Sequence, residues 1–469
     1  MFQHAPLSPL QRDRSERRRC AVYGGIVALA WGLAASPAAK AENLLELFDA
    51  AKGYDAAYLS ARAEAESVRH QAEQAYALKR PSVNLQASIN RNRFESGTPD
   101  AVNPLTGAPV SYSGSSTSKK IGLVARQPLY NAGSNAKVSQ AEQSLNVAEA
   151  DLQIATHDLA VRVTQAYFDV LGAQDVLASA QANKTALSEQ LASAKRSFEV
   201  GNATITDTRE AQARHDLATA QEIAASNELR VKRITLDQLV GRANVVPNPL
   251  RAPSALDSLA PGDLEEWVNQ AGGAPIVRKA EAGLSVAALE IDKARAGHLP
   301  TLDAVASHAR TDIEAGNAAT RTAGGDGTNS SIGLELNVPL YAGHAVQNRI
   351  AEVLQLKEKA EHDVDNAKRK VTLGTRQAYL GVQSGLAQVK AYEAAEASAK
   401  LALEATQLGY RVGVRINKDV LDAQTQLTNT QKDLYKARYD VIVGTVKLRQ
   451  ASGTLKPEDL GQLNKLLSE

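Results

Sequence analysis

Two rhythms of apolar and polar residues run along this chain, and each predicts a different kind of element. Between residues 134 and 200, apolar and small residues step by three and four positions in turn, the heptad pattern of helices that pack along a left-handed seam. The seam positions are Val138, Ala141, Leu145, Ala148, Leu152, Ala155 and Leu159. The same steps return at Val364, Ala367, Val371, Gly374 and Ala378. The pattern predicts two very long helices, 134–200 and 344–411.

Four other segments alternate residue by residue, which predicts strands of roughly ten residues. The apolar positions are Val83, Leu85, Ala87 and Ile89, then Ile121, Leu123 and Ala125, then a weaker run from Thr301, and last Ile332, Leu334, Leu336 and Val338. Such strands fit either a half-buried sheet or the wall of a lipid-facing barrel. The segments 92–117 and 311–330 are rich in Gly, Ser, Thr, Asn and Pro. They are predicted to be mobile loops.

The whole order of elements occurs twice, which indicates a duplicated structural unit. The pairs spaced by 212 residues are Gln165-Ala166-Tyr167 with Gln377-Ala378-Tyr379, Gly201 with Gly413, Asp207 with Asp419, and Gly241 with Gly453. Upstream the spacing drifts: Tyr130 matches Tyr341 at 211, and Pro81 matches Pro300 at 219. Equal spacing follows if both long helices must reach the same tip, whereas insertions around strands and loops are tolerated.

Element lengths constrain how the units assemble. A helix over 134–200 is ~100 Å long, whereas helices over 44–79 and 206–240 are each ~50 Å, so two half-length helices match one long one. Membrane barrels begin at about eight strands, and lipid does not tolerate an open sheet edge. If the four strands span a membrane, the barrel must therefore be shared between chains.

Composition adds a leader and narrow packing. Only 4% of the 469 residues are aromatic, which favours Ala-rich seams over a large globular core. Residues 1–41 combine an arginine cluster, the apolar run 21–35 and Ala39-Lys40-Ala41. This predicts a secretory signal, with Glu42 as the new N-terminus; a retained N-terminal anchor is the alternative. The run is too short for a bilayer span.

Charge and reactive residues exclude several function classes. The leader has a net charge of +4 and the whole chain a net charge of +1, so the residues after the leader carry about −3. They contain no basic block that would suggest a nucleic-acid partner. The only cysteine, Cys20, precedes the apolar run and leaves with the leader, so neither lipidation nor a disulfide is predicted. The other histidines are scattered, and no phosphate-binding loop is present. We therefore predict no enzyme activity, no cofactor and no metal.

Five segments, taken with the duplication, resemble the TolC family of outer-membrane channel proteins across the whole chain after the leader. They are Gly297-His298-Leu299-Pro300-Thr301-Leu302-Asp303, Ala166-Tyr167-Phe168-Asp169-Val170-Leu171, Val200-Gly201 through Ile205-Thr206-Asp207, Gly409-Tyr410-Arg411-Val412-Gly413-Val414-Arg415, and Asp419-Val420-Leu421-Asp422-Ala423. The lack of an acylated cysteine is similar to the unacylated branch of that family, which serves type I secretion.

The resemblance implies an α+β membrane protein that works as a homotrimer. Four strands per chain would form one 12-stranded β-barrel among outer-membrane lipid, continued by a helical tunnel in the periplasm. Residues 42–241 and 276–453 would be the two repeats, with 242–275 and the tail 454–469 in a mixed equatorial belt. Such channels are passive exit ducts for polypeptides or drugs. Their partners are a periplasmic adaptor (membrane fusion) protein and an inner-membrane ABC or proton-driven transporter.

The resemblance also implies a gate at the periplasmic tip. Asp207 of the first repeat and Tyr410 and Arg415 of the second would link neighbouring helix pairs and hold the entrance shut, using forked charge-assisted hydrogen bonds. The alternative is a solvated ion pair worth about 0–1 kcal/mol. Because Phe198 and Ala203 stand opposite Tyr410 and Arg415 in the first repeat, the second repeat is predicted to supply the moving half.

Asp419 and Asp422 are three apart and share one helix face. In a trimer they would place six carboxylates around the pore and bind multivalent cations. The alternative is a solvated acidic face. Asn417 and Lys418 stand where the family more often has apolar residues, and Lys418 would soften the negative ring.

Two further pairs of residues have predicted roles. Gly201 and Gly413 relieve strain at the two turns, and by resemblance the same turns would receive the adaptor. Tyr130 and Tyr341 end matching strands, where an interfacial aromatic girdle would lie.

Two other functions compete with the channel. A periplasmic adaptor or coiled-coil scaffold explains the leader and the heptads, but not four symmetric alternating strands. An extracellular fibrous or adhesin-like protein explains the Ala-rich helices, but not the duplication.

Overall fold

The computed structural model describes residues 42–102, 105–107, 109–201, 203–250, 256, 261–315 and 325–467, all within the unit Ala41–Glu469. The predicted leader 1–41, with Cys20, lies outside these ranges. The elements up to residue 240 are α1 (Leu44–Lys52), α2 (Ala56–Ala77), β1 (Ser82–Val102), β2 (Pro109–Asn131), α3 (Ala132–Glu199) and α4 (Ile205–Val240). Those that follow are α5 (Leu264–Ala271), α6 (Pro275–Arg295), the 3₁₀ helix η2 (Ala296–His298), β3 (Thr301–Ala315), β4 (Gly325–Asn337), α7 (Ala345–Arg411), α8 (Asn417–Ser452) and α9 (Pro457–Asn464).

The spacing of 212 residues recurs in the helix boundaries. Helices α4 and α8 have 36 residues each. They end before Gly241 and Gly453, whose φ angles of 70° and 74° lie in the left-handed region that ends a helix. Helices α3 and α7 have 68 and 67 residues, so each is ~100 Å long. The prediction of two long helices of equal reach is confirmed.

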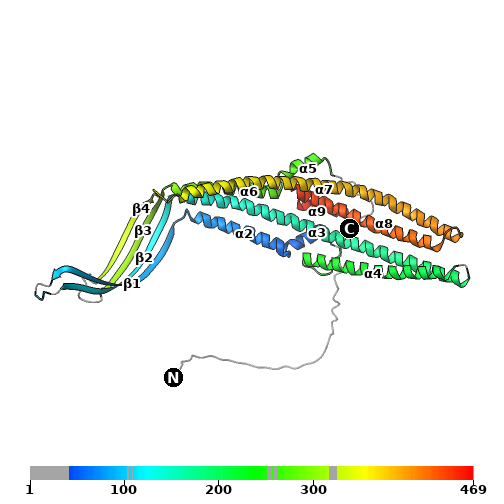
Figure 1. The fold of residues 1–469 in the computed structure, drawn as a ribbon, viewed down its shortest axis with the longest axis horizontal. Helices are drawn as coiled ribbons and strands as arrows, with labels where there is room; N and C mark the ends of the chain where they lie inside the picture. The colour runs from blue at the N-terminus through cyan, green and yellow to red at the C-terminus, as the bar shows by residue number, and fades with distance from the viewer. Residues whose placement is uncertain are drawn as a thin grey trace, which may run out of the picture. The chain divides into compact units, whose positions relative to one another are not determined.

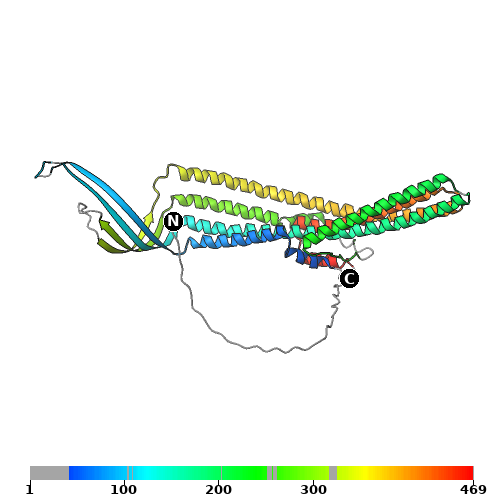
Figure 2. The same cartoon turned by 90° about the horizontal axis from the view of Figure 1, so that it is seen from below.

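The helices form a layer in which the long ones change neighbours halfway along. On the strand side of the layer, α2, α3, α6 and α7 lie side by side in that order (Figure 2). Towards the two turns, α4 takes the place of α2 beside α3, and α8 takes the place of α6 between α3 and α7 (Figure 1). Among the helices of the described ranges, none is long and apolar enough to cross a membrane.

The four strands form one antiparallel sheet in the order β1-β2-β3-β4. They have 21, 23, 15 and 13 residues, so the expectation of about ten is wrong. Much of the predicted loops 92–117 and 311–330 is strand; residues 103–104, 108 and 316–324 lie outside the described ranges. The residues there are mostly polar, so the sequence shows no alternation of apolar and polar positions that would have predicted a strand. Their backbones nevertheless pair, as Arg91 with Thr117 and Arg93 with Ser115 do, because ladder hydrogen bonds use main-chain groups alone.

The register separates the sheet into an apolar and a polar face. Residues opposite each other in antiparallel strands point to the same side. Leu85 lies opposite Leu123 and Ala304 opposite Leu334, whereas Gln86 lies opposite Gly122. The apolar face holds Val83, Leu85, Ile121, Leu123, Ile332, Leu334 and Leu336, all of which are exposed.

A cluster of short elements surrounds the middle of α3 and the end of α8, and we call it the waist. Its buried side chains come from α1, α3, α4, α7, α8, the C-terminal end, and Val245 and Leu256 between α4 and α5. Among them are Leu44, Leu47, Phe48, Tyr167, Phe168, Leu236, Val389, Ile442, Leu460 and Leu463. The hydroxyl of Tyr167 donates to the carbonyls of Glu42 (3.3 Å) and Asn248 (3.1 Å). The waist thus joins chain segments far apart in sequence.

The predicted single opening helix 44–79 is wrong, because the chain breaks between α1 and α2. Asp55 caps α2 by accepting from the Tyr58 amide at 2.8 Å, and its carboxylate pairs with Arg162 of α3 at 2.8 Å. This hydrogen-bonded ion pair lowers the pKa of Asp55. The contact with α3 allows α1 to turn into the waist while α2 continues along α3.

Candidate functional site at the two helix turns

The hairpins α3–α4 and α7–α8 each turn at a glycine. Gly201 has φ 78° and Gly413 has φ 81°, a conformation that costs a residue with a Cβ about 1–2 kcal/mol. The Gly201 amide donates to the Phe198 carbonyl at 3.0 Å, and the Gly413 amide to the Tyr410 carbonyl at 3.1 Å. The two turns therefore share one backbone geometry.

The helices that leave the two turns begin differently. Thr204 caps α4: its hydroxyl accepts from the Asp207 amide (3.2 Å), and the Asp207 carboxylate accepts from the Thr204 amide (2.9 Å). This reciprocal capping box satisfies two amides that the helix leaves unpaired. Helix α8 follows Ile416, which makes no side-chain cap. Asp419, the equivalent of Asp207, lies 3.6 Å from Arg415 instead.

The three residues of the predicted gate make separate contacts. Asp207 bonds to Thr204, and the Arg415 side chain lies against Gly409, where an added Cβ would be 2.8 Å from Arg415 Cγ. Tyr410 packs on a small apolar cluster formed by Leu403, Val420 and Leu427. Within the described ranges, no hydrogen bond or ion pair joins Asp207 to Tyr410 or Arg415. The gate stays a prediction about contacts between neighbouring helix pairs.

The two carboxylates of the predicted cation ring have cations close by in the same chain. Asp422 lies 2.5 Å from the Lys418 ammonium and 2.7 Å from the Arg214 guanidinium. The hydrogen bond from Lys418 is the main cause of the lowered pKa of Asp422. Asp419 has Arg415 beside it. No group of three or more His, Cys, Asp or Glu side chains in the described ranges is placed to hold a metal ion.

Two contacts at the turns connect the repeats, and the duplication did not predict them. The amide of Gln190 on α3 donates to Asn417 at the start of α8, which is 2% exposed. Arg214 of α4 reaches Asp422 of α8. The sequence signal for the first contact was the polar Asn417, at a position where the family more often has an apolar residue. Arg214 gave no signal, because only the fold brings α4 close to α8.

A partly buried hydrogen bond joins the same two hairpins at the waist. The Tyr439 hydroxyl of α8 donates to the Asp175 carboxylate of α3 at 2.5 Å. Burial raises the pKa of Asp175, which the Tyr439 bond and the nearby Arg438 only partly offset. The two hairpins are thus joined at both ends of the α3–α8 contact.

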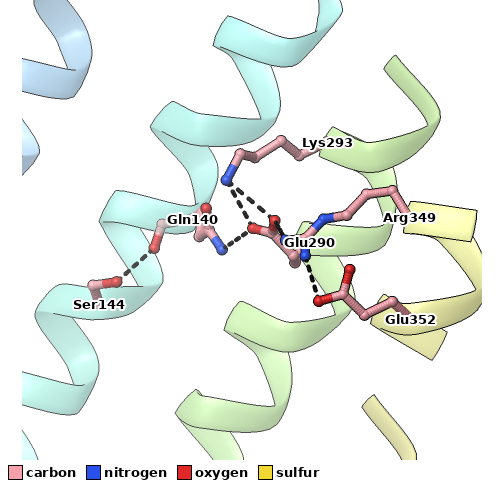
Figure 3. A network of polar contacts seen from close by, with 6 residues as sticks. All are labelled: Gln140, Ser144, Glu290, Lys293, Arg349 and Glu352. Carbon is pink, nitrogen blue, oxygen red and sulfur yellow. Dashed lines mark hydrogen bonds and ion pairs between the residues drawn. The ribbon is translucent and has the colours of Figure 1, made fainter. Parts of the chain in front are cut away.

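On the strand side of the waist, one carboxylate links three helices (Figure 3). Glu290 of α6 accepts from Lys293 (2.9 Å), from Gln140 of α3 (2.8 Å) and from Arg349 of α7 (2.6 Å). Burial alone would raise the pKa of Glu290, but the three donors outweigh it and lower that pKa to about 2. Arg349 also pairs with Glu352 at 2.7 Å. The network fixes α6 between α3 and α7.

The two tyrosines predicted to end matching strands differ in position. Tyr130 lies inside β2, opposite Leu302 and next to a register irregularity at Pro128. Tyr341 lies beyond β4, which ends at Asn337, so the expectation that Tyr341 ends a strand is wrong, whereas its place at the membrane interface stays a prediction. Proline has no amide to donate. The pairing of β2 with β1 ends at Arg126, and past its proline β2 continues on β3 alone, with Tyr130 opposite Leu302. β4 ends at Asn337, before Pro339.

Comparisons with known proteins agree on one family. The family model of the outer membrane efflux protein matches residues 48–242 and 270–454. Outer membrane protein TolC of Vibrio cholerae is 32% identical over 430 residues, which cover 92% of this chain and 94% of that protein. The alkaline protease secretion protein AprF of Pseudomonas aeruginosa is 30% identical, over 72% of this chain and 70% of that protein.

A solved structure shares the fold. The outer membrane protein VceC from Vibrio cholerae superimposes with a TM-score of 0.69 over 87% of this chain and 96% of its own, at 18% identity. Together with the family match over both repeats, this favours the channel over the adaptor, scaffold and adhesin alternatives. The chain belongs to the outer membrane efflux protein family and is an outer-membrane protein.

Proposed function

We propose that three copies of this family member form a passive export channel through the outer membrane. The observation that carries the proposal is the open sheet. β1 and β4 end the strand order, so the outer edge of each has no strand partner in the described chain. Unpaired backbone groups cost several kcal/mol each in lipid. Pairing β4 of each copy with β1 of the next gives a closed barrel of 12 strands with no edge.

The helices on the two outer sides of the layer support the same closure. Helix α4 has an exposed seam with steps of three and four, at Ala213, Leu217, Ala220, Ala224, Asn227, Val231 and Ile234. Helix α7 has one with steps of seven, at Leu373, Leu380, Ala387, Ala394, Leu401 and Leu408. Both are separate from the buried seams that face α3 and α8. Packing α4 of one copy on α7 of the next covers both seams and continues the layer into a tunnel.

The faces of the sheet fit a barrel in lipid. Its exposed apolar face spans about seven residues of each strand, or ~20 Å at 3.3 Å per residue, close to the apolar band of outer-membrane barrels. The face that would line the pore holds Asn84, Gln86 and Ser88 of β1. Tyr130 and Tyr341 would lie at the rim of the apolar band on the helix side.

The turns are proposed to meet the partners. Val200, Val412 and Val414 are 65–78% exposed beside Gly201 and Gly413, which gives each turn an apolar tip for a periplasmic adaptor. An inner-membrane ABC or proton-driven transporter would drive export, because the channel has no energy source of its own. A relative named for alkaline protease secretion supports polypeptide cargo; the family description supports efflux of smaller compounds.

The entrance is proposed to close through Asp207, Tyr410 and Arg415 of neighbouring helix pairs. Asp419 and Asp422 would line the closed entrance and bind multivalent cations, against the opposition of Lys418. Asp419→Ala combined with Asp422→Ala is expected to reduce the block of single-channel current by such cations. Unchanged block would contradict this role of the two carboxylates.

The assembly is tested by light scattering of the detergent-purified protein and by current in planar bilayers. The proposal expects the mass of three chains and a steady conductance. Leu401→Glu places a charge on the α7 seam and is expected to lower the trimer fraction. Ala395→Glu, an exposed position off that seam, is the matched control. A single-chain mass together with no current would rule the proposal out.

A further inference from the structure

Three charged side chains of the sheet form one cluster near the end where the strands meet the helices. Arg126 of β2 lies 2.9 Å from the Asp303 carboxylate of β3 and 2.7 Å from the Glu335 carboxylate of β4. We call these residues the charge triad. The guanidinium bridges three neighbouring strands with two hydrogen bonds, and a forked cation suits that geometry.

The register places the charge triad on the polar face of the sheet. Arg126 is opposite Ser82 of β1 and Val305 of β3, and Asp303 is opposite Glu335. These positions alternate with the apolar ones, such as Leu334 and Leu336. In the trimeric barrel of the proposed function, the polar face lines the water-filled pore. The charge triad then faces the permeating ions.

The charge triad is unbalanced. One guanidinium faces two carboxylates, so each chain contributes a net charge of −1, and three copies at the same height contribute −3. The side chain of Asp303 is 16% exposed and that of Glu335 is 55% exposed. Arg126 therefore holds Asp303 within the sheet, and Glu335 presents the excess charge to the solvent. Rings of carboxylates select cations in pores.

Strands β3 and β4 also carry an ion pair without net charge on the opposite face of the sheet. Arg310 of β3 lies 2.9 Å from Asp326 of β4, and both are about two-thirds exposed. Arg310 and Asp326 are in register with the apolar positions rather than with Glu335. This pair has the same chemistry and strands, but no net charge and no access to the pore. It is a matched internal control.

We propose that the charge triad makes the barrel end of the channel selective for cations, with Glu335 as the residue that faces the ions and Arg126 as the residue that limits the charge. The inference rests on the proposed channel function. In this proposal the net negative charge of the triad causes the preference for cations. A change in that charge therefore changes the cation preference, whether or not the sheet becomes less stable.

The test is the reversal potential in planar bilayers under a KCl gradient near 0.1 M, where screening extends over about 10 Å. All variants carry Asp419→Asn and Asp422→Asn, so that the carboxylates at the entrance do not dominate. Glu335→Gln neutralises the triad and is expected to lower the K⁺/Cl⁻ permeability ratio about twofold, whereas Arg126→Gln raises it by a similar factor. Arg126→Lys keeps the charge and is expected to leave the ratio unchanged.

The opposite signs separate charge from structural damage, because a loosened sheet would move both variants in one direction. Arg310→Gln and Asp326→Asn are expected to leave the ratio where it was. Shifts of equal sign for Glu335→Gln and Arg126→Gln, no shift at all, or an equal shift in the outer pair would overturn the inference while the channel stands. Absence of current in the parent protein would remove the channel itself and the inference with it.

Discussion

The waist and the turns hold the same long helices together by different means. At the waist, aromatic and aliphatic side chains of α1, α3, α8 and α9 form one continuous buried cluster, in which Phe168 contacts Tyr167 and Tyr439. Towards the turns the buried clusters shrink to three residues each, such as Leu187, Ala218 and Leu421. Ion pairs between helices supply the rest, as between Arg214 of α4 and Asp422 of α8.

This difference predicts that the waist is the more stable region and that the turns open locally at a lower free-energy cost. Regions with few buried apolar contacts open locally at lower free energy than the global unfolding transition. The waist fixes α3 and α8 relative to each other at one end. The turns are then expected to change their spacing without unfolding the chain, as the proposed gate requires.

The largest effect is expected from the waist. Phe168→Ala removes a ring that is 1% exposed and lies 5.8 Å from the Tyr439 ring. Such truncations cost about 3–5 kcal/mol. We expect a lower midpoint of denaturant unfolding for the whole protein, measured by circular dichroism. An unchanged midpoint would show that the waist is not the stable centre.

The same kind of truncation near the turns is expected to act locally. Leu421→Ala removes a side chain that is 1% exposed from the cluster with Leu187 and Ala218, at a cost of about 2–5 kcal/mol. We expect faster hydrogen exchange in α8 and α4 near the turns, measured by mass spectrometry, with the exchange of the waist unchanged. Equal acceleration in both regions would mean that they unfold as one unit.

The turns were predictable from the sequence because their determinants are local. Gly201 and Gly413 allow the left-handed backbone of the turns without help from distant residues. The spacing of 212 residues identified the two turns as equivalent. Heptad steps likewise gave both long helices. The polar partners across α4 and α8, such as Arg214 with Asp422, depend on which helices the fold makes neighbours.

The waist was not predictable, because its contacts also depend on which elements the fold makes neighbours. Its polar contacts join residues hundreds of positions apart: the Leu44 amide donates to the Asn464 side chain at 3.0 Å. The break between α1 and α2 depends on Asp55 finding Arg162 on another helix, which no local pattern records. The predicted strand lengths were too short, because main-chain pairing continues where the side-chain alternation ends.

A smaller effect is expected from the caps of the two hairpins. Thr204→Ala removes the capping box of α4 and is expected to destabilise that end by about 1 kcal/mol. Ile416→Thr builds the equivalent box with Asp419 and is expected to stabilise the start of α8 by a similar amount. Hydrogen exchange of the first-turn amides of α4 and α8 measures both. If the second repeat moves, Ile416→Thr also lowers the fraction of open channels in bilayers, whereas a structural cap alone leaves that fraction unchanged.

The smallest effect is expected from acid, and its sign differs between the two regions. The folded-state pKa of Asp422 is lowered, so its contribution to stability is present above the unfolded pKa of about 3.9 and is lost as the pH falls through the folded value. The pKa of Asp175 is raised; its contribution is complete below the unfolded pKa and is lost as the pH rises through the folded value. Acidification below about pH 4 should therefore speed hydrogen exchange at the turns and not at the waist. Asp422→Asn should flatten the response of the turns, and Asp175→Asn that of the waist. A uniform response along α3 would mean that net charge, rather than these two carboxyls, governs how the chain loosens in acid.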